Sequence, residues 1–71
     1  MKPAQLKFMR DLARWQHVAT ARDLGPQTSQ EENSARQFCK RQGWVTFEDG
    51  YWRSTDKGRA ALRAVNELTA S

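Results

Sequence analysis

The dipeptide Asp49-Gly50 is the feature that most constrains how this chain can fold. It separates two short runs, residues 44–48 and 51–54, that are rich in β-branched and aromatic side chains. Asp-Gly between such runs is a strong signal for two antiparallel strands joined by a two-residue turn. The sequence therefore predicts a β-hairpin, with strands too short to stand alone and in need of helices to cover one face.

The two-residue turn also fixes the register of that hairpin. Phe47 is expected to face Trp52 across the two strands, and Thr46 to face Arg53. Because side chains alternate between the two faces of a strand, Val45 is expected on the same face as Phe47 and Trp52. All three are large and apolar, so this face is predicted to be buried.

Helical patterns precede the hairpin. Residues 3–16 begin with Pro3, which suits the first turn of a helix, and carry apolar side chains at steps of three and four. The expected apolar face consists of Leu6, Phe8, Met9, Leu12, Ala13 and Trp15. A short extended stretch at residues 17–19 and a short helix over residues 21–24 should follow, the latter capped by Thr20 with Asp23.

A third helix is expected over about residues 28–42. Its start is marked by two alternative capping pairs, Ser29 with Glu32 or Thr28 with Glu31, and Gly43 ends it. After the hairpin, Ser54 or Thr55 is expected to cap a last helix over residues 56–68. The apolar stripe of this last helix is Ala61, Leu62, Val65 and Leu68.

Length and composition exclude several classes of protein. With 71 residues the chain is expected to form a single domain over residues 1–71, and its 12 Lys and Arg against 8 Asp and Glu give a formal charge of +4, which favours anionic partners. Cys39 is the one cysteine, so no internal disulfide can form, and a reducing cytoplasm is expected. No apolar run is long enough for a membrane span, so none is expected. We also expect no small-molecule ligand and no cofactor. No metal site is expected either, since His17 has no second ligand nearby. The glycines, acids and hydroxyls fit caps and turns rather than a catalytic constellation, so no enzyme is predicted.

Two stretches carry a resemblance to a known class of domain. Residues 38–45, Phe-Cys-Lys-Arg-Gln-Gly-Trp-Val, and residues 51–62, Tyr-Trp-Arg-Ser-Thr-Asp-Lys-Gly-Arg-Ala-Ala-Leu, resemble the end of the recognition helix and the return strand of winged helix-turn-helix domains. The likeness spans about residues 19–62 and is to small MarR-, PadR- and ArsR-type regulators of bacteria or phages. It implies an α+β fold, mainly helical, with three to four helices and a two-stranded β-hairpin wing. Ser54 departs from the pattern, which usually has an apolar residue there.

The resemblance implies a cytoplasmic DNA-binding transcription regulator. The helix over residues 28–42 would read the major groove, and the wing over residues 44–54 would contact the backbone or the minor groove. With Ala35, Phe38, Cys39 and Gln42 placed inward, the residues expected at double-stranded DNA are Gln30, Asn33, Ser34, Arg36, Gln37, Lys40, Arg41, Tyr51 and Arg53.

Other partners stay open at this stage. The same fold can serve as a protein-protein interaction module or adaptor, with Glu31, Glu32 and an exposed Trp44 in the contact surface. Structured RNA bound through its backbone is a third option. A homodimer is also open, because a domain of this size offers little surface for tight DNA binding.

Overall fold

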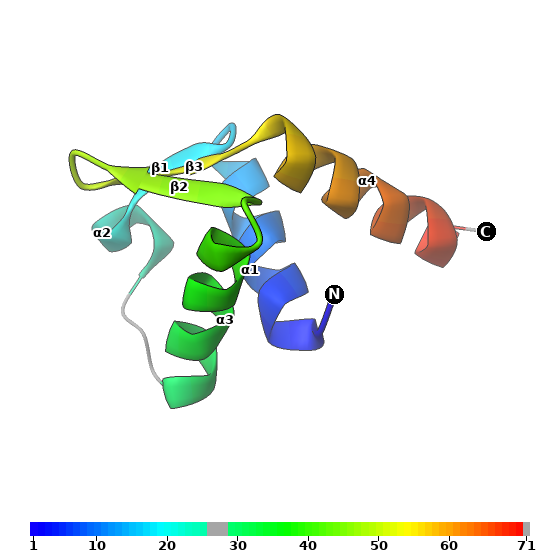
Figure 1. Ribbon diagram of the computed structural model, residues 1–71, viewed down its shortest axis with the longest axis horizontal. Coiled ribbons are helices and arrows are strands. Elements are labelled where there is room, and N and C mark those ends of the chain that lie inside the picture. Colours follow the sequence, from blue (N-terminus) through cyan, green and yellow to red (C-terminus); the bar gives the residue numbers. More distant parts are fainter. Residues whose placement is uncertain (26–28, 71) are drawn as a thin grey trace.

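Helix α1 (Pro3–Arg14) and helix α3 (Gln30–Arg41) pack side by side beneath a small antiparallel sheet (Figure 1). This arrangement comes from a computed structural model that describes residues 1–25 and 29–70. Within those residues the elements that complete the fold are β1 (Val18–Thr20), α2 (Ala21–Leu24), β2 (Val45–Glu48), β3 (Tyr51–Ser54) and α4 (Asp56–Ala70). The coarse expectation of an α+β, mainly helical fold is confirmed.

The sheet has three strands in the described part of the chain, in the order β1-β3-β2, with both pairs antiparallel. The hairpin register is the expected one, because Phe47 pairs with Trp52 and Thr46 with Arg53. The extended stretch before α2 forms β1, which pairs Ala19 with Trp52 along the free edge of β3. The expected two-stranded hairpin is therefore confirmed, and the short strand that precedes α2 adds a third strand, paired along β3 from Arg53 to Tyr51.

The short helices begin at the caps that the sequence indicates. The Thr20 hydroxyl accepts a hydrogen bond from the Asp23 amide at 3.0 Å, and the Asp23 carboxylate accepts one from the Thr20 amide at 3.1 Å. In α3 the Ser29 hydroxyl accepts from the Glu32 amide at 3.2 Å, which favours the first of the two capping alternatives. Thr28, the cap of the other alternative, lies outside the described residues.

Thr55 joins the end of α3 to the start of α4. Its hydroxyl accepts a hydrogen bond from the Gly58 amide at 3.0 Å, as an N-cap does, and donates one to the Gly43 carbonyl at 2.5 Å. Its own amide donates to the Trp44 carbonyl at 2.9 Å. Of the two expected caps, Ser54 and Thr55, the structure uses Thr55.

The core lies where α1, α3 and the inner face of the sheet meet. Met9, Leu12 and Cys39 are fully buried there, and the Phe8 ring meets the Trp52 ring edge-on with centroids 5.4 Å apart. Burial raises the pKa of the Cys39 thiol to about 11, so this side chain is a small apolar group of the core, as the sequence indicated.

Two aromatic side chains expected in the core are exposed. Trp15 is 50% exposed because α1 ends at Arg14 rather than residue 16, and the next residues, Gln16 and His17, have positive φ values that turn the chain. Phe47 is 42% exposed although it shares a sheet face with Trp52, its ring centroid lying 4.7 Å from that of Trp52. Its position near the hairpin turn explains this exposure, because that end of the hairpin extends beyond α1 and α3 (Figure 1).

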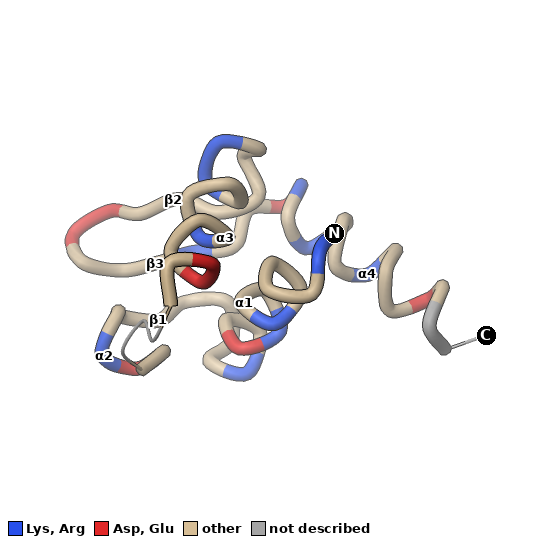
Figure 2. Tube along the Cα trace, turned by 90° about the horizontal axis from the view of Figure 1, so that it is seen from below, with Lys and Arg blue, Asp and Glu red and all other residues tan. Residues whose placement is uncertain are grey.

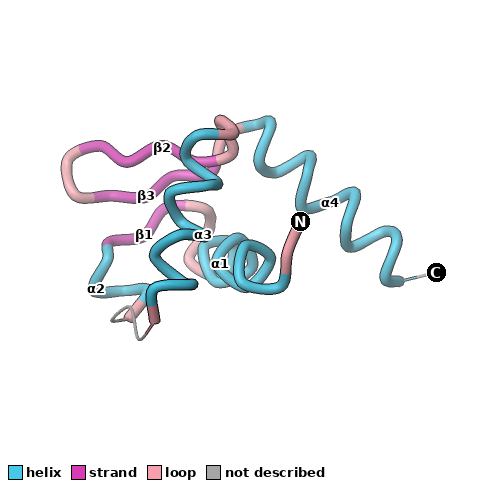
Figure 3. The backbone as a smooth tube through the Cα atoms, turned by 60° about the horizontal axis from the view of Figure 1, so that its bottom comes forward, coloured by secondary structure: helices cyan, strands magenta, loops and turns pink. Residues whose placement is uncertain are grey.

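Helix α4 is attached at its first turns and then leads away from the rest of the molecule (Figures 1 and 3). Leu62 is buried in the core, whereas Leu68 is 77% exposed. The expected apolar stripe of this helix is thus buried in its first half only, and the placement of Leu68 in the core was wrong. The reason is geometric, since the C-terminal end of α4 extends beyond α1 and the sheet (Figures 1 and 3).

Candidate nucleic-acid interface

Helix α3 is turned about its axis relative to the expected orientation. Ala35 and Cys39 face inward as expected, but Gln42 is exposed and Phe38 is half-buried against Trp44, which is also half-buried. Arg36 takes the remaining inward position, with only 7% of its surface exposed. The expectation that Arg36 lies on the outer face of this helix was therefore wrong. Its long aliphatic stem allows it to be buried while its guanidinium lies over an aromatic ring of α1.

The outer face of α3 carries the remaining candidates of this helix. Four of these side chains are uncharged and polar and two are basic, and all of them are exposed. They are Gln30, Asn33, Ser34, Gln37, Lys40 and Arg41. Because side chains three and four positions apart lie on one side of a helix, these six form a continuous polar surface along the element. The structure thus brings together six of the nine residues that the sequence indicated.

The two acids in the first turn of α3 are turned toward α1. The Glu32 carboxylate pairs with the Lys7 ammonium at 3.5 Å, and it is half-buried. Glu31 lines an open groove between α3 and the start of α1, to which Lys2 also contributes. At the helix N-terminus both carboxylates also meet the positive end of the helix dipole. Their negative charge is therefore partly balanced before any partner approaches.

Tyr51 and Arg53 lie on a different surface. Trp52 between them points into the core, so these two point to the outer face of the sheet, where the Arg53 guanidinium lies 6.0 Å from the centre of the Tyr51 ring. Both are exposed, but they do not join the outer face of α3. At the end of the hairpin Glu48 and Asp49 add two negative charges, visible as the red end of the β2–β3 hairpin in Figure 2.

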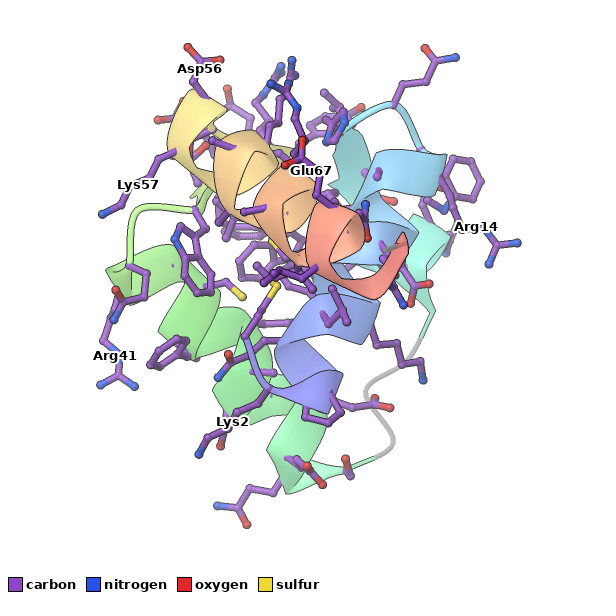
Figure 4. The ribbon with its side chains drawn as sticks, turned by 90° about the vertical axis from the view of Figure 1, so that its right-hand side faces the viewer. Lys2, Arg14, Arg41, Asp56, Lys57 and Glu67 are labelled. Atoms are coloured by element: carbon purple, nitrogen blue, oxygen red, sulfur yellow. The ribbon has the colours of Figure 1, made fainter. Side chains whose placement is uncertain are left out.

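Two basic residues that the sequence did not indicate lie close to α3. Lys57, in the first turn of α4, passes over Gly43, and its Cδ lies 3.9 Å from the position that a Cβ at residue 43 would take. Lys2 lines the same groove as Arg41. In Figure 4, Lys57 and Arg41 project to the left with Lys2 below them, while Arg14 projects to the right. Only the tertiary fold brings these residues together, so no local pattern could have found them.

His17 lies away from α3, at the start of β1. Its Nδ1 is 3.0 Å from the Ser54 hydroxyl oxygen, with which it shares a hydrogen bond. Burial, together with the charge of Arg59, lowers the pKa of the imidazole below its ordinary value of 6.5. Ser54 thus holds this turn against the sheet.

Two further properties hold over residues 1–25 and 29–70. In this part of the chain no helix combines the length and the apolar character that crossing a membrane requires. Nor does any group of three or more His, Cys, Asp or Glu side chains in these residues come close enough together to hold a metal ion.

No protein-family model matches this chain, and no curated protein or solved structure matches it either. What the chain does must therefore be inferred from the geometry of its own residues.

Proposed function

We propose that this chain is a winged helix-turn-helix domain that binds double-stranded DNA and acts as a transcription regulator. The observation that carries the proposal is the outer face of α3, six exposed polar and basic side chains along one side of a helix of 12 residues. A helix with such a face matches the width and the chemistry of the major groove of B-DNA.

The topology supports this proposal. The element order α1-β1-α2-α3-β2-β3-α4 is the one that the resemblance to winged helix-turn-helix domains implies. Helix α2 precedes α3 along the chain, as the first helix of such a motif precedes the recognition helix. The hairpin that follows α3 corresponds to the wing.

Each type of side chain on the α3 face has a role in DNA recognition. The amides of Asn33 and Gln37 can each donate and accept, which matches N6 and N7 of adenine in the major groove. Gln30 and Ser34, nearer the helix N-terminus, would reach base edges in the same groove. Lys40 and Arg41 are cations at the other end of the helix and would contact phosphates, which fixes the position of the helix on the duplex.

Titration against random-sequence duplex DNA tests the proposal directly. Fluorescence anisotropy at about 50 and 200 mM salt should give a non-specific Kd of roughly 10⁻⁴ to 10⁻⁶ M that weakens steeply as salt increases. No binding at the lower salt concentration would reject DNA as the partner.

Matched variants locate the surface. Arg41→Ala should weaken binding, while Arg14→Ala removes the same charge on the opposite side of the molecule (Figure 4) and should leave Kd unchanged. Once a preferred site has been selected, Gln37→Ala should bind preferred and random sequences more equally, because this variant removes a group that reads a base rather than one that binds a phosphate.

A protein-interaction module is the second candidate, and one observation favours it. Phe47 is 42% exposed at the end of the hairpin, next to the carboxylates of Glu48 and Asp49. An exposed aromatic ring can anchor a protein contact. Trp44 and Glu32, which the sequence suggested for such a surface, are half-buried and so contribute less to it. If the chain is a protein-interaction module, Phe47→Ala should abolish capture of a protein partner. Neither the wild type nor this variant should then bind DNA.

A further inference from the structure

Positive charge is distributed unevenly between the hairpin and the helices. The hairpin end holds Glu48 and Asp49, and its one arginine, Arg53, lies on the sheet face turned away from α1 and α3. A wing with two acids at its end repels the phosphates of a duplex. The backbone contacts of a DNA complex must therefore come mainly from elsewhere in this chain.

Basic side chains from three different parts of the chain lie along one side of α3 (Figure 4). Arg41 is in its last turn, Lys57 comes from the first turn of α4, and Lys2 precedes α1. We call these three residues the basic track. All three are exposed, and Figure 4 shows them along one side of the molecule.

Contacts in the fold hold this track together. Lys57 passes over Gly43, two residues beyond Arg41, so that its stem follows the chain that leaves α3. The first turn of α4 is fixed in this place by the hydrogen bonds that Thr55 makes to Gly43 and Gly58. Lys2 and Arg41 line one groove between α1 and α3, in which Glu31 is the acid. These contacts fix the backbone positions from which the three exposed side chains project.

We propose that the basic track binds the phosphate backbone of the duplex, and that the hairpin end stays off the DNA. The inference rests on the proposed function, and it specifies which side of α3 faces the sugar-phosphate strand. With α3 in the major groove, the strand passes along the side of the helix that carries Arg41, from Lys2 across Arg41 to Lys57. Recognition of this kind differs from a wing that reaches into the minor groove.

The salt dependence of DNA affinity provides the first test. Removing one cation that binds a phosphate should reduce the slope of log K against log salt by about 0.9. Lys57→Ala and Lys2→Ala are each expected to reduce it by that amount, whereas Arg14→Ala and Arg63→Ala, which remove exposed charges outside the track, should leave it unchanged. Equal reductions for all four variants would overturn the track, since they would reflect net charge alone.

Removing negative charge provides the second test. Glu31→Gln, in the groove of the track, should tighten binding several-fold, and the double variant Glu48→Gln with Asp49→Asn should leave Kd unchanged. Asparagine suits residue 49, where φ is +53°. Tighter binding by the hairpin double variant with no effect of Glu31→Gln would overturn the proposal and place the backbone at the hairpin.

An alternative role for the cations of the track is structural, since basic groups stabilise the C-terminal end of a helix through its dipole. Thermal unfolding distinguishes this structural role from phosphate binding. A Lys57→Ala protein with a lower Tm and an unchanged salt slope would overturn the proposal. If that variant keeps the wild-type slope while Gln37→Ala still relaxes sequence preference, the track fails and the proposed function stands. A wild-type protein that does not bind duplex DNA would reject both.

Discussion

The guanidinium carbon of Arg36 lies 5.4 Å from the centre of the Phe8 ring. The pair joins α3 to α1 at a position where an aliphatic residue would be the ordinary choice, and Arg36 is 7% exposed there. A cation over an aromatic face is attracted by the ring quadrupole, and the attraction increases as water is excluded. Arg36 is therefore a residue of the interface between the two helices.

Arg36→Ala is expected to lower the free energy of unfolding by about 1–2 kcal/mol, because it removes both the packing of the arginine stem and the interaction with the Phe8 ring. Denaturant unfolding measures this change. Arg36→Met keeps most of the aliphatic volume and should lose less stability. At a temperature well below the unfolding transition, both variants should bind duplex DNA as the wild type does. A loss of affinity in a fully folded Arg36→Met protein would show that the guanidinium reaches the DNA.

Gly58 is expected to tolerate no side chain, although it lies within a helix. A Cβ at this position would overlap the carbonyl of Trp44, which is backbone and cannot rotate away. Glycine-to-alanine changes inside helices ordinarily stabilise by about 1 kcal/mol. Here Gly58→Ala should instead destabilise by about 1–3 kcal/mol, as overpacking does.

Thermal unfolding compares Gly58→Ala with Arg63→Ala, an exposed change in the same helix that should be nearly neutral. A Gly58→Ala protein that is more stable than the wild type would mean that α4 does not lie against Trp44 in solution.

His17 makes stability depend on pH. Its pKa in the folded state is below the ordinary value of 6.5, through burial and the nearby charge of Arg59, so the unfolded chain binds the proton more readily. Stability is therefore highest above pH 6.5, falls as the pH drops through that value, and levels off once the folded protein is protonated too. Denaturant unfolding between about pH 8 and pH 5 measures the change. His17→Asn, which suits the positive φ at this position, should remove this component, and an unchanged pH profile for that variant would assign the effect to other groups.

The Cys39 thiol should be inert in the folded protein. It is fully buried, and burial raises its pKa to about 11, so little thiolate forms at neutral pH and reagents cannot reach it. Alkylation at pH 8 should be very slow under native conditions and rapid in denaturant. Rapid native labelling would show that α3 separates from the core on the time scale of the reaction.

Local signals in the sequence predicted local structure well. The turn at Asp49-Gly50 fixes the pairing of Phe47 with Trp52, because two residues suffice to define a hairpin. The caps at Thr20 and Ser29 are likewise formed by residues three positions apart. These features depend on few neighbours, so the sequence contains the information needed to predict them.

Features that depend on distant parts of the chain were harder to predict from the sequence. The pairing of Ala19 with Trp52 joins residues 33 positions apart, and nothing near residue 19 indicates it. Trp15 follows the apolar period of α1, but the helix ends before it, and periodicity does not report where a helix ends. In the candidate interface, Arg36 was placed outward because Phe38 and Gln42 were set inward with Ala35 and Cys39, and its burial depends on Phe8, which lies on another helix.

The hydrogen bonds of Thr55 have a mechanical consequence. One hydroxyl group holds the carbonyl that follows α3 and the first turn of α4 at the same time. Because this linkage is short, a tilt of α4 is expected to be transmitted to the final turn of α3. A molecule that binds α4 is therefore expected to change the angle at which the outer face of α3 is presented.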